Sequence, residues 1–124
     1  MRLLLILASL ALVGGSAWAQ ASGDLVKPGQ EVFEANCAQC HRTNGEGLPA
    51  TFPALNKNPF VLGEPLPVIA TVLNGRKGNL GQMPSWKDKL DNQQIAAVVT
   101  YIRQAWSNRA AAATPAMVAA ARTK

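Results

Sequence analysis

The stretch Cys37-Ala38-Gln39-Cys40-His41 holds both cysteines and the single histidine of this 124-residue chain. Two cysteines and one histidine placed at random would fall into this arrangement roughly once in ten thousand sequences. Residues three and four positions apart lie on one side of a helical turn, so the two sulfurs and the imidazole face the same way. A disulfide between cysteines this close would constrain the unfolded chain very little. The spacing therefore indicates a chemical use of the two thiols.

Three kinds of site use cysteine and histidine at such spacings. A zinc site needs further ligands with metal-site spacing, and the chain has no other cysteine or histidine. A thioredoxin-like pair needs a parallel-sheet context, which the sequence lacks. Cys-x-x-Cys-His is the pattern of covalent haem attachment, in which each sulfur forms a thioether with one vinyl group. We therefore predict one covalently attached haem c per chain, bound through Cys37 and Cys40, with His41 as an axial iron ligand.

The N-terminal segment predicts export. Arg2 is the only charge among the first 23 residues, and it is followed by an apolar run over residues 3–13 and by Ala17-Trp18-Ala19. This order is typical of a signal peptide, so we expect residues 1–19 to be removed and the protein to lie in the periplasm. The alternative is an uncleaved membrane anchor, because residues 3–23 are uncharged and about 20 residues suffice to cross a bilayer.

Length and charge narrow the classes of protein. The chain has room for one small domain, whose core is marginal unless a cofactor or metal adds apolar bulk. Its net charge is +5, but the basic residues are dispersed, which argues against a nucleic-acid partner. Six of these residues are expected around the cofactor opening, where they would favour an acidic redox partner: Arg42, Lys57, Arg76, Lys77, Lys87 and Lys89.

The hydrophobic periodicity predicts an all-α protein with three to four short helices and long loops. Helices are expected from Pro28 to Cys37, from Pro65 to Leu73 and from Asp91 to about Trp106, the last with a capping box formed by Asp91 and Gln94. Residues 43–63 and 75–87 read as irregular segments. The alanine-rich stretch 109–124 lacks large side chains, so we expect a loosely held or disordered tail.

The chain resembles class I bacterial cytochromes c over about residues 28–106. The resemblance rests on the attachment pattern at residues 37–41 and on Gly81-Gln82-Met83-Pro84-Ser85-Trp86, supported by Gly29 with Phe33 and by Pro53-Ala54-Leu55. It implies a cytochrome c fold over residues 20–108, wrapped around the haem, with Met83 as the second axial ligand. Met1 in the signal peptide and Met117 in the tail are poor alternatives. A thioether ligand favours ferrous iron and so raises the reduction potential.

The resemblance also implies supporting roles for several residues. Pro53 follows His41 by twelve positions and would accept a hydrogen bond from its ring, or it only shapes the loop. Trp86 would lie near a haem propionate or simply pack, and Arg76 would pair with a propionate or remain solvated. Several apolar side chains would pack on the porphyrin or on each other, namely Leu55, Phe60, Ile69, Val98 and Ile102. Gly29 and Phe33 would lie where the first helix crosses the helix that begins at Asp91, with Tyr101 or Ile102 opposite.

Two filled axial positions leave no site for a substrate. We therefore expect a monomeric periplasmic electron carrier, without enzymatic activity and without a small-molecule substrate. It would carry one electron from a dehydrogenase or quinol-oxidising complex to a terminal oxidase or reductase. A haem enzyme such as a peroxidase would need an open iron position or a second haem. A tethered or complexed cytochrome subunit of a periplasmic dehydrogenase or oxidase remains open as the alternative.

Overall fold

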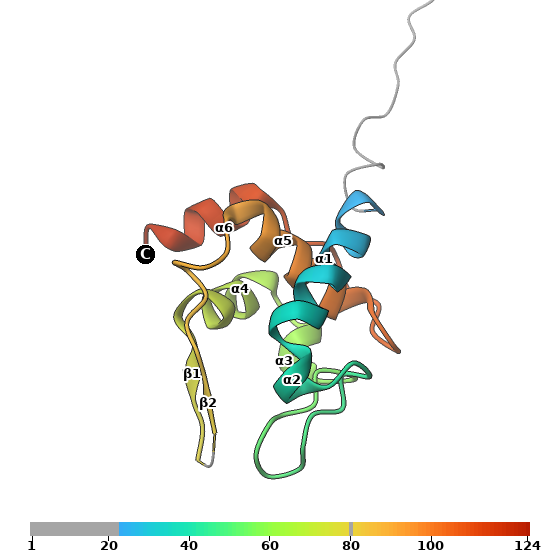
Figure 1. The fold of residues 1–124 in the computed structure, drawn as a ribbon. Coiled ribbons are helices and arrows are strands. Elements are labelled where there is room, and N and C mark those ends of the chain that lie inside the picture. Colours follow the sequence, from blue (N-terminus) through green and yellow to red (C-terminus); the bar gives the residue numbers. More distant parts are fainter. Residues whose placement is uncertain (1–22, 80) are drawn as a thin grey trace, which may run out of the picture.

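The computed structural model describes residues 23–79 and 81–124, so the expected signal peptide lies outside the described residues (Figure 1). The protein is mostly helical with long loops, which confirms the expected all-α cytochrome c fold, but the described residues form six helices instead of three to four, two of them single turns. In chain order the elements are α1 (Gly23–Asn36), α2 (Ala38–His41), α3 (Pro59–Leu62), α4 (Pro65–Asn74), β1 (Arg76–Lys77), β2 (Gln82–Met83), α5 (Asn92–Gln104) and α6 (Pro115–Arg122).

The crossing of α1 and α5 forms the centre of the fold (Figure 1). Gly29 lies at the contact, where an added Cβ would stand 2.0 Å from the carbonyl oxygen of Ala97. Phe33 is fully buried one turn later, and its ring centroid lies 5.4 Å from that of Tyr101. The predicted crossing is therefore confirmed, and a residue without a side chain allows the two backbones to approach closely.

The boundaries of α1 and α5 differ from the expected ones. Helix α1 begins at Gly23, so Pro28 lies inside the helix instead of in its first turn. Proline lacks an N–H and costs one helical hydrogen bond, but the earlier turn buries Leu25 in the core. Helix α5 begins with the predicted capping box and ends at Gln104. Beyond it, Trp106 has a φ of 55° and its indole N–H donates to the carbonyl of Thr43 over 2.9 Å.

The expectation of a loose tail over residues 109–124 is wrong. Thr114 caps helix α6 by accepting a hydrogen bond from the N–H of Met117, and α6 packs against α4 and α5. Ala113 and Val118 are fully buried. Small side chains let α6 approach its neighbours closely, so the lack of large residues did not preclude packing.

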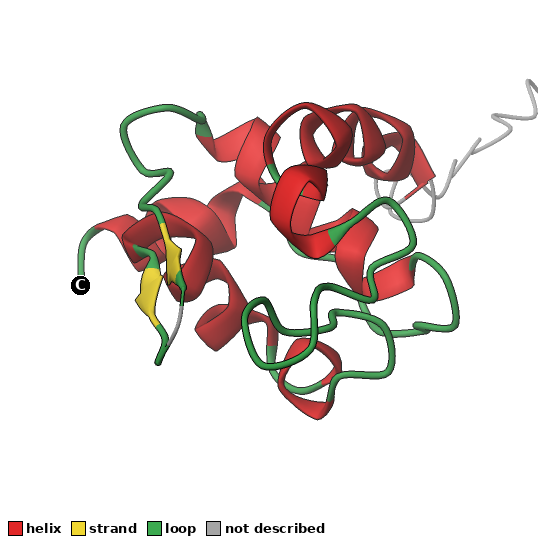
Figure 2. Cartoon of the chain, turned by 60° about the horizontal axis from the view of Figure 1, so that its bottom comes forward, coloured by secondary structure: helices red, strands yellow, loops and turns green. Residues whose placement is uncertain are grey.

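Residues 75–87, expected to be irregular, include a short hairpin. Strands β1 and β2 pair antiparallel, with Arg76 opposite Met83 and Lys77 opposite Gln82. Figure 2 shows this hairpin in yellow at one side of the molecule and long green loops at the other. Across the described parts of the chain, 23–79 and 81–124, no helix has both the length and the apolar character that crossing a membrane requires.

Candidate cofactor site

A cavity of about 680 Å³ lies between the helices and the loops. The segment around α2 borders it with Cys37, Cys40 and His41, and the segment that begins with β2 borders it with Met83 and Trp86. Figure 1 shows that these two segments extend away from the main helices on different sides of the molecule. Helices α4 and α5 contribute apolar side chains to the lining, namely Val68, Val72, Val98 and Ile102.

Helix α2 is a single turn that brings the attachment residues to the cavity. The N–H of Cys37 donates to the carbonyl of Phe33, so the chain continues directly from α1. The N–H of His41 donates to the carbonyl of Cys37 over 3.0 Å, which closes the turn between these two residues. Arg42 has a φ of 64° and ends the helix, so the chain turns sharply after His41.

His41 is buried and has a fixed tautomer. Its Nδ1–H donates to the carbonyl oxygen of Pro53 over 3.0 Å, at the predicted spacing of twelve residues. That bond leaves Nε2 as the unprotonated ring nitrogen, which is the form that binds a metal. Burial lowers the pKa of His41, although the hydrogen bond to Pro53 opposes this shift. The neutral imidazole therefore predominates at neutral pH.

The two cysteines are free thiols that both lie at the cavity. Burial, and secondarily the neighbouring Cys40, raises the pKa of Cys37 to about 11. The Cys37 thiol is therefore protonated at neutral pH. Neither sulfur is committed to a disulfide, so both remain available for thioether bonds.

Met83 reaches the cavity because the chain returns tightly after α4. Gly75 has a φ of 75°, and an added Cβ there would lie 2.5 Å from the carbonyl oxygen of Met83. Beyond the hairpin, the N–H of Trp86 donates to the carbonyl of Val72 over 3.1 Å, and the hydroxyl of Ser85 donates to the carbonyl of Leu73. Met83 is thus held between a β-pairing and a row of contacts to the end of α4.

The other residues singled out from the sequence also line the cavity. Leu55 is buried at the cavity. Trp86 also borders the cavity, and the Lys89 ammonium lies 5.2 Å from the centroid of the Trp86 ring. The Arg76 guanidinium lies 5.7 Å from the ring centroid of Phe60, and both residues border the cavity. Of the expected apolar set, Phe60, Val98 and Ile102 line the cavity with Leu55, whereas Ile69 belongs to the closed core.

The expected ring of basic residues is only partly formed. Of its six members Arg76 alone lines the cavity. Lys87 and Lys89 line a different hollow, beside the N-terminus of α5 and α6. Lys89 nevertheless lies close to the cavity, because its ammonium contacts Trp86 at the border.

Asn108 supports the cavity wall and was missed in the sequence. Its side chain is fully buried and donates to the carbonyls of Leu55 and Ile102 over 3.0 and 2.7 Å. Its Oδ1 accepts from the N–H of Lys57 over 2.8 Å. One amide therefore ties the loop that carries Leu55 to α5. An asparagine just after a helix has no periodicity that would distinguish it from a turn residue.

Arg103 is a second unpredicted support. Only 2% of the residue is exposed, and its guanidinium donates to the carbonyls of Val61, Gly63 and Ala111. These bonds join α3, α5 and the segment before α6. Because Val61 lines the cavity, Arg103 holds part of its wall.

The residues at the cavity fit a haem c. They supply two thiols for covalent attachment, an imidazole and a thioether for the iron, and apolar side chains for the porphyrin faces. The volume lies within the range of about 300–1,000 Å³ that is usual for cofactor sites. Among the residues that the structure describes, no three His, Cys, Asp or Glu side chains gather as a metal-binding group.

Comparison with known proteins identifies the family. The family described as "Cytochrome C oxidase, cbb3-type, subunit III" matches residues 24–102. Cytochrome c-552 of Thermus thermophilus is 32% identical over 114 residues, covering 82% of this chain and 72% of that protein. Cytochrome c6 of Bryopsis maxima is 38% identical over 82 residues, covering 64% of this chain and 90% of that protein.

Larger proteins also contain a similar segment. The cytochrome c subunit of alcohol dehydrogenase (quinone) from Gluconacetobacter polyoxogenes is 36% identical over 99 residues, which is 73% of this chain. The chain spans about a fifth of the length of that subunit, since the match covers 21% of it. Together with the helical fold, these matches show that the chain belongs to the class I cytochromes c, in the family described as cytochrome c oxidase, cbb3-type, subunit III, with covalently bound haem c as its cofactor.

Proposed function

We propose that this protein carries single electrons on one haem c, which is attached through Cys37 and Cys40 and bound axially by His41 and Met83. The observation that carries this proposal is that both thiols, the imidazole and the thioether border one cavity. When bound, the haem supplies a reversible one-electron couple. The protein's own part is to fix the ligands and to keep water from the iron.

Each ligand has a defined task in this proposal. His41 offers Nε2 because its Nδ1–H is held by Pro53. That bond also makes the imidazole a stronger donor. The soft sulfur of Met83 favours ferrous iron and raises the reduction potential. With both positions filled, no substrate reaches the metal. Arg76 and Trp86 at the cavity edge are proposed to meet the propionates.

We further propose that the protein works as a monomer in the periplasm after loss of residues 1–19. The net charge of +5, which becomes +4 once Arg2 is lost with residues 1–19, favours an acidic redox protein as partner. The donor would be a dehydrogenase or quinol-oxidising complex, and the acceptor a terminal oxidase or reductase. N-terminal sequencing of native protein should begin at Gln20. A sequence that begins at Met1 in membrane-bound material would contradict this proposal.

The second candidate function is that of a tethered or complexed cytochrome subunit. It is favoured by the similarity to a dehydrogenase cytochrome c subunit and to the cbb3-type oxidase subunit CcoP of Azospirillum brasilense, which is 32% identical over 80 residues. Gel filtration of a native periplasmic extract separates the two functions. A free carrier elutes near the mass of the single chain, whereas a subunit elutes with its complex.

Substitution of Met83 tests the electron-carrier proposal. Ferric wild-type protein should be low-spin and show the weak far-red band of methionine-ligated haem. Met83→Ala should abolish this band and admit cyanide and peroxide. It should also lower the reduction potential by about 0.1–0.3 V, a fraction of the roughly 0.8 V that axial ligands span.

Met117→Ala is the matched control. Met117 is a partly buried methionine that packs on the core from α6 and is not among the residues that line the cavity. The spectrum and the potential of this variant should equal those of the wild type. If Met83→Ala also leaves both unchanged, Met83 is not a ligand, and the closed, substrate-free carrier loses its basis.

A further inference from the structure

We infer that the C-terminal helix α6 acts through Arg122 as a brace that keeps Met83 at the haem iron. Arg122 is thus a positioning residue for the electron carrier. The inference rests on the proposed role of Met83 as an axial ligand. Helix α6 lies beyond residues 24–102, which match the family, so nothing in that match accounts for its role.

Apolar contacts hold helix α6 in place independently of Arg122. Val118 is fully buried, and Met117 and Ala121 pack against the same core. These contacts join α6 to α4 and α5, two of the helices that contribute apolar side chains to the cavity. The last turn of α6 is therefore held at a fixed place beside the segment that precedes α5.

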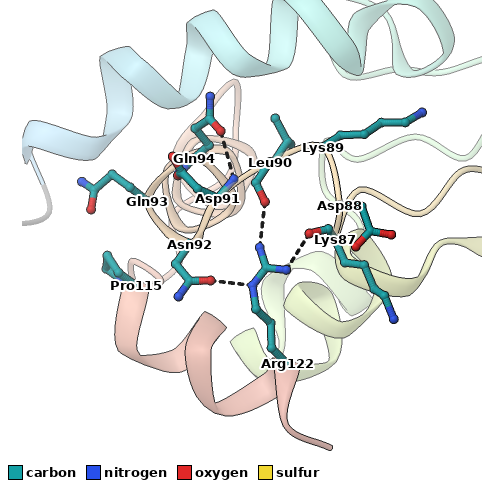
Figure 3. A pocket seen from close by; sticks show the side chains of 10 residues that line it. All are labelled: Lys87, Asp88, Lys89, Leu90, Asp91, Asn92, Gln93, Gln94, Pro115 and Arg122. Carbon is teal, nitrogen blue, oxygen red and sulfur yellow. Dashed lines mark hydrogen bonds between the residues drawn. The ribbon is translucent and has the colours of Figure 1, made fainter.

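All three guanidinium nitrogens of Arg122 donate hydrogen bonds to that segment and to the start of α5 (Figure 3). Nη1 donates to the carbonyl of Lys87 over 2.6 Å and Nη2 donates to the carbonyl of Leu90 over 2.7 Å. Nε donates to the side-chain oxygen of Asn92, in the first turn of α5. Hydrogen bonds from a charged donor are stronger than neutral ones, and the planar guanidinium fixes three acceptors at once.

A short path leads from these acceptors to Met83. The N–H of Leu90 donates to the carbonyl of Trp86, and the N–H of Lys87 donates to the carbonyl of Leu73 at the end of α4. Trp86 itself borders the cavity, three residues after Met83. Arg122 thus fixes one end of the segment 83–90, while the β-pairing of Met83 with Arg76 fixes the other.

These anchors, with the hydrogen bonds of Ser85 and Trp86 to the end of α4 between them, matter because the bond between a thioether and ferric iron is weak. If the segment after Met83 moves outward, the sulfur leaves and an external ligand takes its place. The rate of such ligand exchange depends on how often the segment opens locally. Removing one anchor should raise that frequency without unfolding the α1–α5 crossing at Gly29 and Ala97, because Arg122 contacts α5 only at Asn92 in its first turn.

The test compares Arg122→Ala with the wild type as full-length ferric protein with attached haem. The rate of cyanide binding should rise roughly fivefold, as expected for the loss of about one net hydrogen bond. Exchange of the amide protons of Trp86 and Lys87 should accelerate by a similar factor, while amides within α1 and within α5 from Ala97 onward keep their rates. Arg122→Lys should bring the rate of cyanide binding only part of the way back to the wild-type value. Lysine keeps the charge, but its ammonium lacks the planar geometry to hold all three acceptors.

Arg109→Ala is the matched control. Arg109 is also an exposed arginine in the C-terminal region, and its Nη1 donates to the carbonyls of Gln104, Trp106 and Asn108. It has no hydrogen bond to residues 83–92. Its replacement should leave the cyanide rate and the exchange of the Trp86 and Lys87 amides unchanged.

The outcomes separate this inference from the proposed function. A wild-type spectrum without the far-red band means that Met83 is not a ligand, and it overturns both. If the band is present but Arg122→Ala behaves like Arg109→Ala, only the brace is wrong. Equal acceleration of all amides, or faster exchange at Trp86 without faster cyanide binding, also overturns the inference, because Arg122 would then not act on Met83.

Discussion

The α1–α5 crossing and the segments around the cavity are built in different ways. At the crossing, backbone meets backbone at Gly29 and the rings of Phe33, Tyr101 and Trp106 pack with centroids 5.4–5.7 Å apart. Around the cavity, the one-turn helix α3 and the loop that carries Leu55 are held by hydrogen bonds from the side chains of Arg103 and Asn108. Shape complementarity fixes the first region, and scattered polar contacts fix the second.

We expect the two regions to govern different properties: the crossing governs the free energy of unfolding, and the cavity segments govern access to the iron. Close packing is sensitive to added volume, so the crossing should respond to substitution mainly through the free energy of unfolding. Isolated hydrogen bonds open locally, so the cavity segments should respond mainly through access to the iron. The four predictions below test this division.

The largest effect is expected from removing both attachment sulfurs. Cys37→Ser combined with Cys40→Ser should yield protein without covalent haem, because neither hydroxyl replaces a thiol in forming a thioether. Intact mass spectrometry of denatured protein measures this directly. Gln39→Ala, between the two cysteines, should retain the mass of one haem. Wild-type protein that lacks the added mass, when made with a haem-attachment system, would refute the site.

Gly29→Ala should disrupt the crossing itself. The new Cβ would stand 2.0 Å from the oxygen of Ala97, so α1 has to move away from α5. We expect a loss of about 3 kcal/mol in the free energy of unfolding, measured by urea denaturation. Glu31→Ala, at an exposed position of the same helix, should change it by less than about 0.5 kcal/mol. A loss no larger than that of the control would show that the crossing tolerates separation.

Asn108→Ala probes the connection between the two regions. It removes hydrogen bonds to the carbonyls of Leu55 and Ile102 and to the N–H of Lys57, all in a buried setting. The free energy of unfolding should fall by about 2 kcal/mol, because buried polar groups lose their hydrogen-bond partners. Asn44→Ala, which removes one exposed hydrogen bond to the N–H of Glu46, should cost almost nothing. Equal stability of the two variants would contradict the role given to Asn108.

The smallest effect concerns the pKa of Tyr101 at the crossing. Burial, and secondarily the charge of Glu34, raises the pKa of this phenol above its usual value of about 10. The unfolded chain therefore loses its phenolic proton first, so stability falls as the pH rises above about 10. Tyr101→Phe should remove this fall. Because the chain has one tyrosine, a single labelled-ring NMR signal reports the titration. A midpoint at or below 10 would contradict the prediction.

The sequence predicted most of the site and much of the fold. The attachment pattern at residues 37–41, the hydrogen bond between His41 and Pro53, and the position of Met83 at the cavity followed from spacing and from the family resemblance. The capping box of α5 and the crossing at Gly29 were also predicted. All of these are local patterns, or positions where one residue type meets a strong requirement.

The supporting residues escaped prediction because their partners lie far away in the sequence. Arg103 bonds to Val61 across 42 positions and Asn108 to Leu55 across 53, and neither distance leaves a periodic signal. The order of the C-terminal stretch escaped for a related reason. Alanines alone do not predict a hydrophobic core. Ala113 and Ala121 become buried or partly buried only because α6 packs against α4 and α5.

The amino-acid sequence by itself therefore predicted which thiols and which imidazole border the cavity, and where α4 and α5 form. These features depend on groups a few residues apart, where the covalent chain sets the geometry. Only the tertiary structure decided which side chains fix the segment that follows Met83. Arg122 reaches Lys87 across 35 positions, and such a contact exists only once packing has brought α6 beside the segment before α5.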